Sequence, residues 1–286
     1  MGGTKILGVA LDAGHVVAGE CRRATPADAS GLVASLVEVV TALCQQLDGV
    51  AAVGVGLPGL VDRRGRLRMA PHLAGVIDLD VAGSLAAATG LAVGVDNDAT
   101  CALVAEHRLG ALRGATDAVL VTLGTGIGGG LLIDGRVRRG PSGFAGELGH
   151  MVVEPEGRPC PCGRSGCWER YASGQALRRL ADESGGDAEG DVVLTRLAGW
   201  VALGLANLVH VLDIERVVLG GGLAGLGEEL LGPVRSAFLE RVMAPAQRPP
   251  VEIVVAELGE RAGAIGAALV ARERLGSHGD RPLRGG

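Results

Sequence analysis

Apolar and polar positions along this 286-residue chain alternate between strand-like runs and helix-like spacings. Residues 50–55 form a β-branched run, whereas residues 30–47 place apolar side chains three and four positions apart, as a helix requires. This alternation predicts an α/β protein with buried parallel strands covered by helices. The expected strands are 6–11, 16–19, 50–55, 91–95, 118–123, 130–133, 216–219 and 251–256, and the expected helices are 30–47, 82–89, 99–109, 192–211, 226–239 and 262–275.

One short pattern occurs twice in the chain, at residues 2–17 and 124–137. Each copy has a segment rich in Gly and Thr, an apolar strand, a turn containing Asp and Gly, and a returning strand. In the first copy we expect Gly14 to supply the positive φ of the turn. A duplicated hairpin unit can place two phosphate-binding loops face to face, and coincidence is the alternative.

The length suggests either two domains or one large α/β unit. We expect residues 1–113, joined by the C-terminal helix 262–275, to form the first domain. Residues 114–261 would form a larger C-terminal domain. Gly, Pro and charged residues dominate the tail 276–286, which is therefore expected to be disordered.

Charge and composition narrow the classes of partner. The net charge is -5 and no block of Lys or Arg stands out, so nucleic acid and anionic lipid are disfavoured and a small molecule fits better. The N-terminus shows no basic-then-apolar leader, so we expect a cytoplasmic protein. The apolar stretch 201–212 is shorter than the roughly 18 residues of a spanning helix, which favours a core helix.

Three glycine-rich segments are candidate phosphate or nucleotide contacts, because glycine lets backbone N–H groups approach an anion closely. Residues 2–5 are weak candidates, since structural turns use the same residue types. The density of glycine at 124–130 is a stronger signal. The triplet 220–222 has an equally good alternative as a helix N-terminal turn packed on the sheet.

Asp96, Asn97 and Asp98 follow a predicted strand, which is where open α/β sheets place ligand groups. One of the carboxylates can orient or deprotonate a hydroxyl, as phosphoryl transfer to an alcohol requires. The alternative is an Asx cap on the helix expected from residue 99.

The most specific feature is a His followed by three closely spaced cysteines. One His and three Cys match a tetrahedral Zn²⁺ set, and a closed set of four ligands is expected to be structural. In a reducing compartment this spacing favours metal over disulfides. Glu147 and Glu169 flank the ligands. Paired carboxylates are suitable acceptors for sugar hydroxyls, and ordinary surface charge is the alternative. The expected zinc ligands are His150, Cys160, Cys162 and Cys167.

In their order along the chain, these motifs resemble the ROK family (repressor, open reading frame, kinase) of sugar kinases and sugar-responsive regulators. The resemblance covers residues 2 to about 275. It rests on Gly-Gly-Thr-Lys at 2–5, Gly-Leu-Pro-Gly at 56–59, Asn-Asp at 97–98, the glycines at 124–131, Glu147 to His150, Cys-x-Cys-Gly-x-x-Gly-Cys-x-Glu at 160–169 and the segment 217–222.

The resemblance implies a duplicated actin-like (ribonuclease H-like) ATPase fold, with ATP and sugar in the cleft between two domains. It makes Asp98 the general base for the sugar hydroxyl, usually that on C6. Mg²⁺ would accompany ATP. Zinc, bound to His150 on the side away from the sugar, would hold this sugar contact in place. The implied sugar ligands are Gly59, Asn97, Asp98, Glu147, His150 and Glu169, and the implied ATP contacts are Gly2, Gly3, Thr4, Lys5, Gly124, Thr125, Gly126, Gly128, Gly221 and Gly222.

The sequence departs from the family pattern in two places. His72 stands where the family commonly has Asn, which bears on the choice of sugar. The Asp that leads the first phosphate loop in the family would fall immediately before Met1. Because the other motifs are intact, we expect translation to begin upstream, with a Val codon taken for Met1; the alternative is a genuine short form with a weakened ATP site.

The leading functional hypothesis is an ATP-dependent, glucokinase-like hexose kinase of carbohydrate metabolism and glycolysis, expected as a homodimer or homotetramer. Kinases of N-acetylmannosamine or N-acetylglucosamine come next. A repressor is disfavoured because no helix-turn-helix segment precedes the first glycine loop. A sugar-binding protein without catalysis is the third hypothesis, against which Asp98 and both glycine loops argue.

Overall fold

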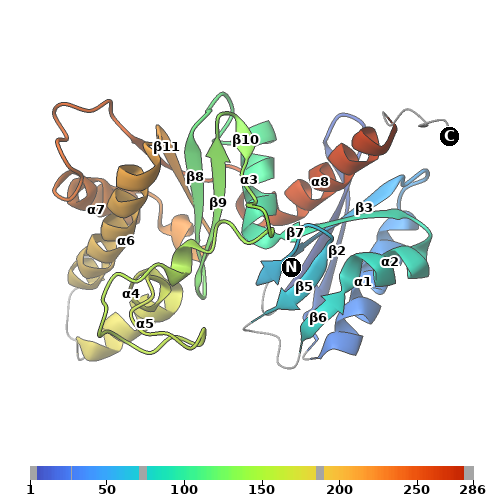
Figure 1. The fold of residues 1–286 in the computed structure, drawn as a ribbon, viewed down its shortest axis with the longest axis horizontal. Helices are drawn as coiled ribbons and strands as arrows, with labels where there is room; N and C mark the ends of the chain where they lie inside the picture. The colour runs from blue at the N-terminus through green and yellow to red at the C-terminus, as the bar shows by residue number, and fades with distance from the viewer. Residues whose placement is uncertain (1–4, 27, 71–75, 185–189, 280–286) are drawn as a thin grey trace. The chain divides into compact units, whose positions relative to one another are not determined.

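The computed structural model describes residues 5–26, 28–70, 76–184 and 190–279 (Figure 1). The chain divides into two compact units. Unit 1 contains Met1–Ala105, Arg139–Phe144 and Glu260–Gly286, and unit 2 contains Glu106–Arg138 and Ala145–Gly259. The domain ranges expected from the sequence stay a prediction. These units differ from them in placing residues 139–144 and 260–261 in unit 1 and residues 106–113 in unit 2.

Unit 2 is built on a five-stranded sheet with β8 at its centre. β8 pairs antiparallel with β9 and parallel with β11. A neighbouring strand therefore pairs with each edge of β8, and five of its six residues are buried. In sheet order the strands are β10 (Arg136–Val137), β9 (Ile127–Ile133), β8 (Ala118–Leu123), β11 (Arg216–Gly220) and β12 (Glu252–Val255).

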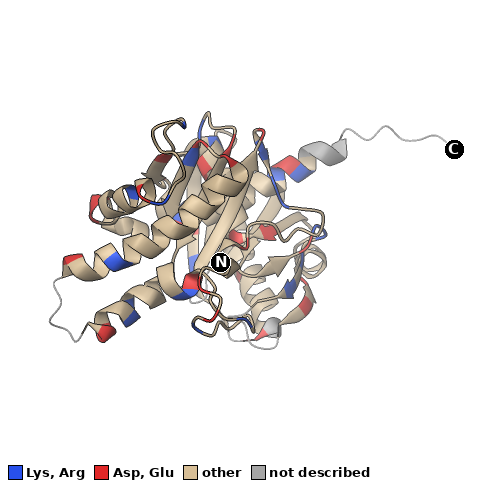
Figure 2. Cartoon of the chain, turned by 60° about the vertical axis from the view of Figure 1, so that its left-hand side comes forward, with Lys and Arg blue, Asp and Glu red and all other residues tan. Residues whose placement is uncertain are grey.

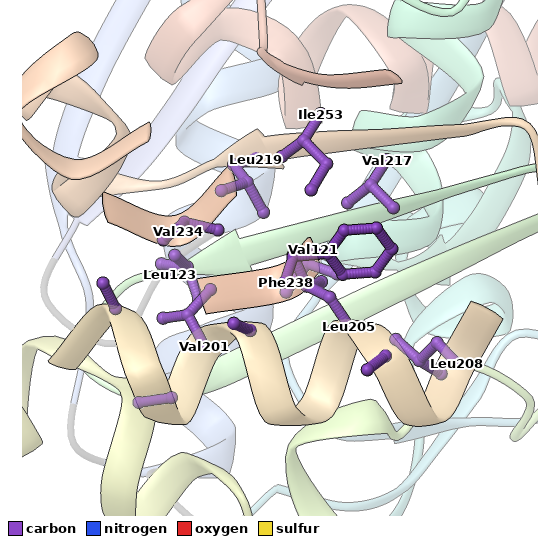
Figure 3. Close-up of a cluster of buried hydrophobic side chains, with 14 of the residues drawn as sticks. Val121, Leu123, Val201, Leu205, Leu208, Val217, Leu219, Val234, Phe238 and Ile253 are labelled. Carbon is purple, nitrogen blue, oxygen red and sulfur yellow. The ribbon is translucent and has the colours of Figure 1, made fainter. Parts of the chain in front are cut away.

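Helices α6 and α7 form the core of unit 2 with one face of this sheet (Figure 3). Leu205 of α6 and Phe238 of α7 point at Val121 of β8, and all three are buried. Successive side chains of a strand point to opposite faces of its sheet, so every second residue of β8 points toward these helices. The helices and short 3-10 turns of unit 2 are η1 (Leu148–His150), α4 (Glu169–Ala172), α5 (Gly174–Glu183), α6 (Gly190–Leu212), η2 (Gly222–Leu226) and α7 (Glu228–Leu239).

α6 is long and apolar enough to cross a membrane by length and composition alone. However, 56% of its apolar window is buried inside the protein. Its buried residues belong to the core of unit 2. This packing agrees with the core helix expected from residues 192–211.

Unit 1 contains two separate two-stranded sheets. β1 and β2 form an antiparallel hairpin, and β3 and β7 pair in parallel. Helix α3 begins in unit 1 and continues into unit 2. Apart from a three-stranded sheet described below, the elements are β1 (Lys5–Leu11), β2 (Val17–Ala24), α1 (Ala29–Cys44), β3 (Ala52–Leu57), α2 (Val81–Thr89), β7 (Ala92–Asn97), α3 (Asp98–Leu109), η3 (Gly259–Arg261) and α8 (Ala262–Gly279).

The C-terminal helix α8 packs against β3 and β7 of unit 1 (Figure 1). Two glycines allow this close contact. A Cβ on Gly54 would lie 1.7 Å from Ala267 O, and a Cβ on Gly266 would lie 1.6 Å from Cys101 O. Both glycines are therefore required by the approach of α8 to β3 and α3.

A three-stranded sheet in unit 1, β4 (Leu60–Val61), β5 (Arg66–Met69) and β6 (Ile77–Asp80), was not predicted from the sequence. Its strands are short and rich in charge, so they lack an apolar run. Opposite charges pair across it: Arg66 Nε lies 3.2 Å from Asp78 Oδ1, and Arg68 Nη1 lies 2.9 Å from the same atom.

Both expected hairpins are present, although the prediction for the first turn is wrong in one detail. The residue with positive φ is His15, at 66°, and Gly14 is not among the positive-φ glycines. Asp12 holds the turn instead, because its Oδ1 accepts a hydrogen bond from Val16 N at 2.9 Å. In the second hairpin Asp134 and Gly135 both have positive φ, as a type I′ turn requires.

The expected disorder from residue 276 is wrong for its first four residues, because α8 continues to Gly279. Residues 280–286 lie outside the described part of the chain. Acidic and basic residues are interspersed along the ribbon (Figure 2), in keeping with the small net charge.

Candidate functional site

In unit 1, Asn97 links the end of β7 to the start of α3. Its Oδ1 accepts hydrogen bonds from Ala99 N at 2.9 Å and Thr100 N at 3.1 Å, which makes it the cap of the helix. Its Nδ2 donates to Gly59 O at 3.2 Å. The structure therefore brings together Gly59, Asn97 and Asp98, three of the residues expected at the site.

Asp98 is the first residue of α3 and is half-buried. Its Oδ1 accepts from Ala99 N at 2.9 Å. Because the side chain of Asn97 caps α3, the capping alternative does not account for Asp98. The partial positive charge of a helix N-terminus favours a carboxylate there.

Asp96, the other candidate carboxylate, has a structural role. It is 5% exposed, and Arg139 Nε donates to its Oδ2 at 2.5 Å. Its Oδ1 accepts from Asn97 N at 2.9 Å. Both oxygens of this buried carboxylate are therefore engaged within the protein, one by Arg139 and one by a backbone amide. Arg139, which fixes this segment, was missed because it stands more than forty positions further along the sequence.

In unit 2, the glycine-rich segment is a shorter loop than expected. Only residues 124–126 lie between β8 and β9, and Gly128 to Gly130 belong to β9. Gly124 N donates to Gly126 O at 3.0 Å, and Gly174 N donates to Gly124 O at 2.7 Å. Thr125, at the tip, is exposed. The loop is thus held at its base and open at its tip.

The remaining glycines of this segment serve packing against η1. A Cβ on Gly129 would lie 2.3 Å from a methyl of Leu148, and a Cβ on Gly149 would lie 2.3 Å from Ile127 O. These close approaches fix the turn that carries Glu147 and His150. Glycine density in the sequence therefore reflected both a loop and a packing requirement.

Gly221 lies against the end of β8, where the 124–126 loop begins. Its φ is 81°, and a Cβ there would lie 2.6 Å from Leu123 O. Gly220 ends β11 and Gly222 begins η2, so the triplet is not the N-terminus of α7. The structure brings Gly221 and Gly124 together at the carboxyl ends of neighbouring parallel strands, where α/β sheets bind ligands.

The four expected zinc ligands of unit 2 converge. One ligand atom from each of His150, Cys160, Cys162 and Cys167 lies within 4.8 Å of all the others. Cys162 Sγ and Cys167 Sγ are 3.6 Å apart, and His150 Nδ1 lies 3.8 Å from Cys160 Sγ. Tetrahedral Zn²⁺ with its usual bond lengths places neighbouring ligand atoms about 3.5–3.8 Å apart, so the cluster fits this ion.

Two glycines make the convergence possible. Gly163 has φ of 87° and its N donates to Cys160 O at 3.0 Å, which closes the first turn. Gly166 has φ of 77°, and a Cβ there would lie 1.8 Å from Glu154 O. Burial raises the pKa of the Cys160 thiol and that of the Cys167 thiol. A bound cation would supply the positive charge that thiolates at these positions need.

Glu147 and Glu169 lie beside this cluster, and both are half-buried, as is His150 of the cluster itself. The ring of His150 is oriented with Nδ1 toward Cys160, while its Nε2 lies 3.9 Å from Glu147 Oε2. The Cys160 thiol donates to Glu169 Oε1 at 3.2 Å. The other oxygen of Glu169 lies 2.5 Å from where a Cβ of Gly126 would be. The glycine loop, the carboxylate and the cysteine cluster are therefore in contact.

The first glycine motif is only partly described. Gly2, Gly3 and Thr4 lie outside the described residues, as does His72. Lys5 begins β1, and its Nζ lies 2.5 Å from Glu260 Oε2. Hydrogen bonds from Lys5 and Arg22 lower the pKa of the Glu260 carboxyl to about 2. The observed partner of the Lys5 ammonium is thus a carboxylate of unit 1.

Comparisons with known proteins identify the relatives of this chain. A model of the ROK family matches residues 1–274. The chain belongs to the ROK family. It is 32% identical to the glucokinase of Streptomyces coelicolor over 306 residues, with 96% of each chain covered. It is also 32% identical to an N-acetylmannosamine kinase of Escherichia coli over 295 residues, with 96% of this chain and 97% of the relative covered.

A solved structure supports the same assignment. The ROK family glucokinase of Streptomyces griseus, crystallised in complex with glucose and AMPPNP, superposes with a TM-score of 0.88 at 34% identity. The match covers 96% of this chain and 97% of that chain. The predicted family and its actin-like two-domain ATPase fold are confirmed by this likeness.

Proposed function

We propose that this ROK-family chain is an ATP-dependent hexose kinase that transfers the γ-phosphate of ATP to the C6 hydroxyl of a hexose, with glucose the first candidate. Its full-length relatives are sugar kinases, and so is this chain. The observation that supports the chemistry is the arrangement at the end of β7. Asn97 caps α3, and Asp98 carries a half-buried carboxylate at the first position of the same helix, which we assign as the acceptor of the sugar hydroxyl proton.

Phosphoryl transfer depends mainly on positioning and on electrostatic stabilisation, with a base to orient the acceptor oxygen. Asp98 would take the hydroxyl proton as the sugar oxygen attacks the γ-phosphorus, while the bond from that phosphorus to the bridging oxygen breaks and ADP leaves. We assign the ATP phosphates to residues 2–5 and to the loop 124–126, and the adenosine to Gly221 and Gly222. Mg²⁺, when bound with ATP, neutralises charge on the phosphate oxygens.

The sugar hydroxyls would be held by carboxylates and by His150. Glu147 and Glu169 are suitable acceptors because each presents two carboxylate oxygens. In this proposal, Nδ1 of His150 and the three cysteines would hold a structural zinc, and Nε2 would remain for a sugar hydroxyl. A metal bound on one ring nitrogen fixes the tautomer and orientation of the other.

The identity of the sugar is tested by an ADP-release assay over a panel of hexoses and N-acetylhexosamines. The highest kcat/KM is expected with glucose. A preference for N-acetylmannosamine would select the second candidate. The likeness of this chain to the N-acetylmannosamine kinase of Escherichia coli supports that candidate. Absence of turnover on every sugar would contradict both and leave a sugar-binding protein.

Gly126→Ala is expected to weaken sugar binding without unfolding the protein. The new Cβ would displace the end of the Glu169 side chain, which can rotate, so little stability is lost. Losing one hydrogen bond from a charged group raises KM for the sugar roughly tenfold to a hundredfold.

The matched control for Gly126→Ala is Gly225→Ala, because a Cβ at Gly225 meets nothing within 4 Å. Steady-state kinetics and thermal unfolding of both variants make the comparison. Equal KM values in the two variants would remove Glu169 from the sugar site.

The proposed activity also suggests where the enzyme acts in the cell and in metabolism. We place the enzyme in the cytoplasm, where ATP and the free hexose occur, at the first step of glycolysis. We further propose a homodimer or homotetramer.

A further inference from the structure

Four arginines of unit 2 lie close together, and three of them face the carboxylate of Glu183 in α5. Arg158 Nη2 lies 2.5 Å from Glu183 Oε1, and Arg179 Nε lies 3.8 Å from the same oxygen. Arg196 Nη2, from α6, lies 3.9 Å from Oε2. Arg170 of α4 joins this group, because Arg179 Nη2 donates a hydrogen bond to its carbonyl oxygen. These four residues, called the arginine cluster from here on, connect the cysteine-rich loop with helices α4, α5 and α6, which pack on one another (Figure 1).

The charges of the arginine cluster do not balance. Among the residues that the structure describes, Glu183 is the only carboxylate that forms an ion pair with it. Four guanidinium groups therefore share one carboxylate, so the cluster carries an excess of positive charge. Burial, together with the positive charges of Arg158 and Arg170, lowers the pKa of the Arg179 guanidinium. Cations that repel one another in this way are stabilised by a further anion close by.

Hydrogen-bond acceptors are also in short supply in the arginine cluster. Nε of Arg170 and Nε of Arg179 are buried, and neither has a hydrogen-bond partner within the described part of the chain. Buried N–H groups almost always have an acceptor, because a group without one has lost its hydration and gained nothing in return. Arg196 makes no hydrogen bond to Glu183 either, since 3.9 Å is too long for one. The cluster thus offers N–H donors for an acceptor that the described residues do not supply.

We propose that the arginine cluster binds a phosphate group, carried by inorganic phosphate or by a phosphorylated sugar. A guanidinium group presents parallel N–H donors that match the oxygens of phosphate. A phosphate dianion supplies both the acceptors and the negative charge that the cluster lacks, whereas a carboxylate supplies a single charge. The side chains of Arg158 and Arg196 are 42% and 50% exposed, so the anion can enter from solvent. None of the four arginines is among the residues proposed above for ATP or sugar, so phosphate binding here does not depend on the proposed function.

Two tryptophans lie beside the arginine cluster and can report on it. Tyr171 Oη accepts a hydrogen bond from Arg158 N at 2.7 Å, and the ring centroids of Tyr171 and Trp200 are 4.5 Å apart. Trp168 Nε1 in turn donates to Trp200 O at 2.7 Å. The chain contains two tryptophans, so its whole tryptophan fluorescence comes from this region. We therefore expect phosphate binding to change that fluorescence.

The test titrates the full chain with inorganic phosphate and, separately, with glucose 6-phosphate, at an ionic strength held constant with NaCl. Calorimetry and tryptophan fluorescence give the stoichiometry and the affinity. Arg196→Gln and Arg158→Gln are each expected to weaken binding at least about tenfold, because each removes a charged hydrogen-bond donor. Glu183→Gln is expected to tighten binding at least about threefold, because it removes a negative charge that repels the phosphate. A merely structural role of Glu183 would not produce this gain.

Arg178→Gln is the matched control, because Arg178 is an exposed arginine of α5 that forms no ion pair in the described part of the chain. It should bind phosphate as the parent does. Equal losses in Arg178→Gln and Arg196→Gln would reduce the effect to net charge and overturn the proposal. Absence of binding to the parent would overturn it too, as would binding to Glu183→Gln that is no tighter than to the parent. Tighter binding of glucose 6-phosphate than of phosphate, lost in Arg196→Gln, would identify the phosphorylated sugar as the ligand, and equal binding would identify free phosphate. None of these readouts uses kinase activity, so they test the arginine cluster separately from the proposed function.

Discussion

Replacing Asp98 by Asn is expected to lower kcat by about 10²–10⁴ while sugar affinity stays close to that of the parent enzyme. The amide keeps the size of the side chain but cannot take the hydroxyl proton. The helix should survive, because its cap is Asn97 and not Asp98. Steady-state kinetics gives kcat, and calorimetric titration with the sugar gives the affinity.

Asp191→Asn is a matched control for this substitution. Asp191 also lies in the first turn of a helix, α6, and it is exposed. Its replacement removes a similar favourable charge at a helix N-terminus but no proposed proton acceptor. A near-normal kcat for Asp98→Asn, or equal losses in the two variants, would exclude Asp98 as the general base.

Replacing Cys162 by Ser is expected to remove zinc and to raise KM for the sugar about 10–100-fold. The parent protein should contain about one zinc per chain, as a site with four protein ligands predicts. Without the metal, Nδ1 of His150 loses the ion that orients the ring, and its Nε2 is no longer fixed beside Glu147. Elemental analysis and sugar-dependent kinetics measure the two effects.

Cys44→Ser provides the control, because Cys44 is a half-buried thiol of α1 outside the cluster. It should retain zinc and sugar KM. If Cys162→Ser lowers thermal stability but leaves sugar KM unchanged, zinc supports the fold without positioning His150. Active enzyme without zinc would contradict the metal assignment itself.

Elements with a strong apolar period were predicted well from the sequence. Residues 118–123 form a strand with the expected bounds, and residues 192–211 lie within α6. The strands between Leu60 and Asp80 were missed because charged pairs, and not apolar side chains, dominate them. The glycines of β9 were misassigned to a loop, since the sequence does not show that η1 packs against them.

The site was predicted residue by residue, yet its internal contacts were not. The spacing of the cysteines was enough to expect their convergence. No sequence pattern could show that Nδ1 of His150 faces Cys160 or that Gly126 lies against Glu169, because these contacts join segments that only the fold brings together. The choice of Asn97 over Asp98 as the cap depends on backbone geometry at one helix start.

The packing of α8 on β3 also affects how the chain folds during synthesis. The contact of Gly54 with Ala267 joins a strand made early to a helix made more than two hundred residues later. At a ribosome rate of about 5–20 residues per second, β3 waits roughly 10–45 s for its covering helix. Most of unit 2 is encoded in between, and its sheet and helices come from one nearly continuous segment. Unit 2 can therefore fold on the ribosome first, while the N-terminal strands remain exposed to chaperones until the last helix emerges.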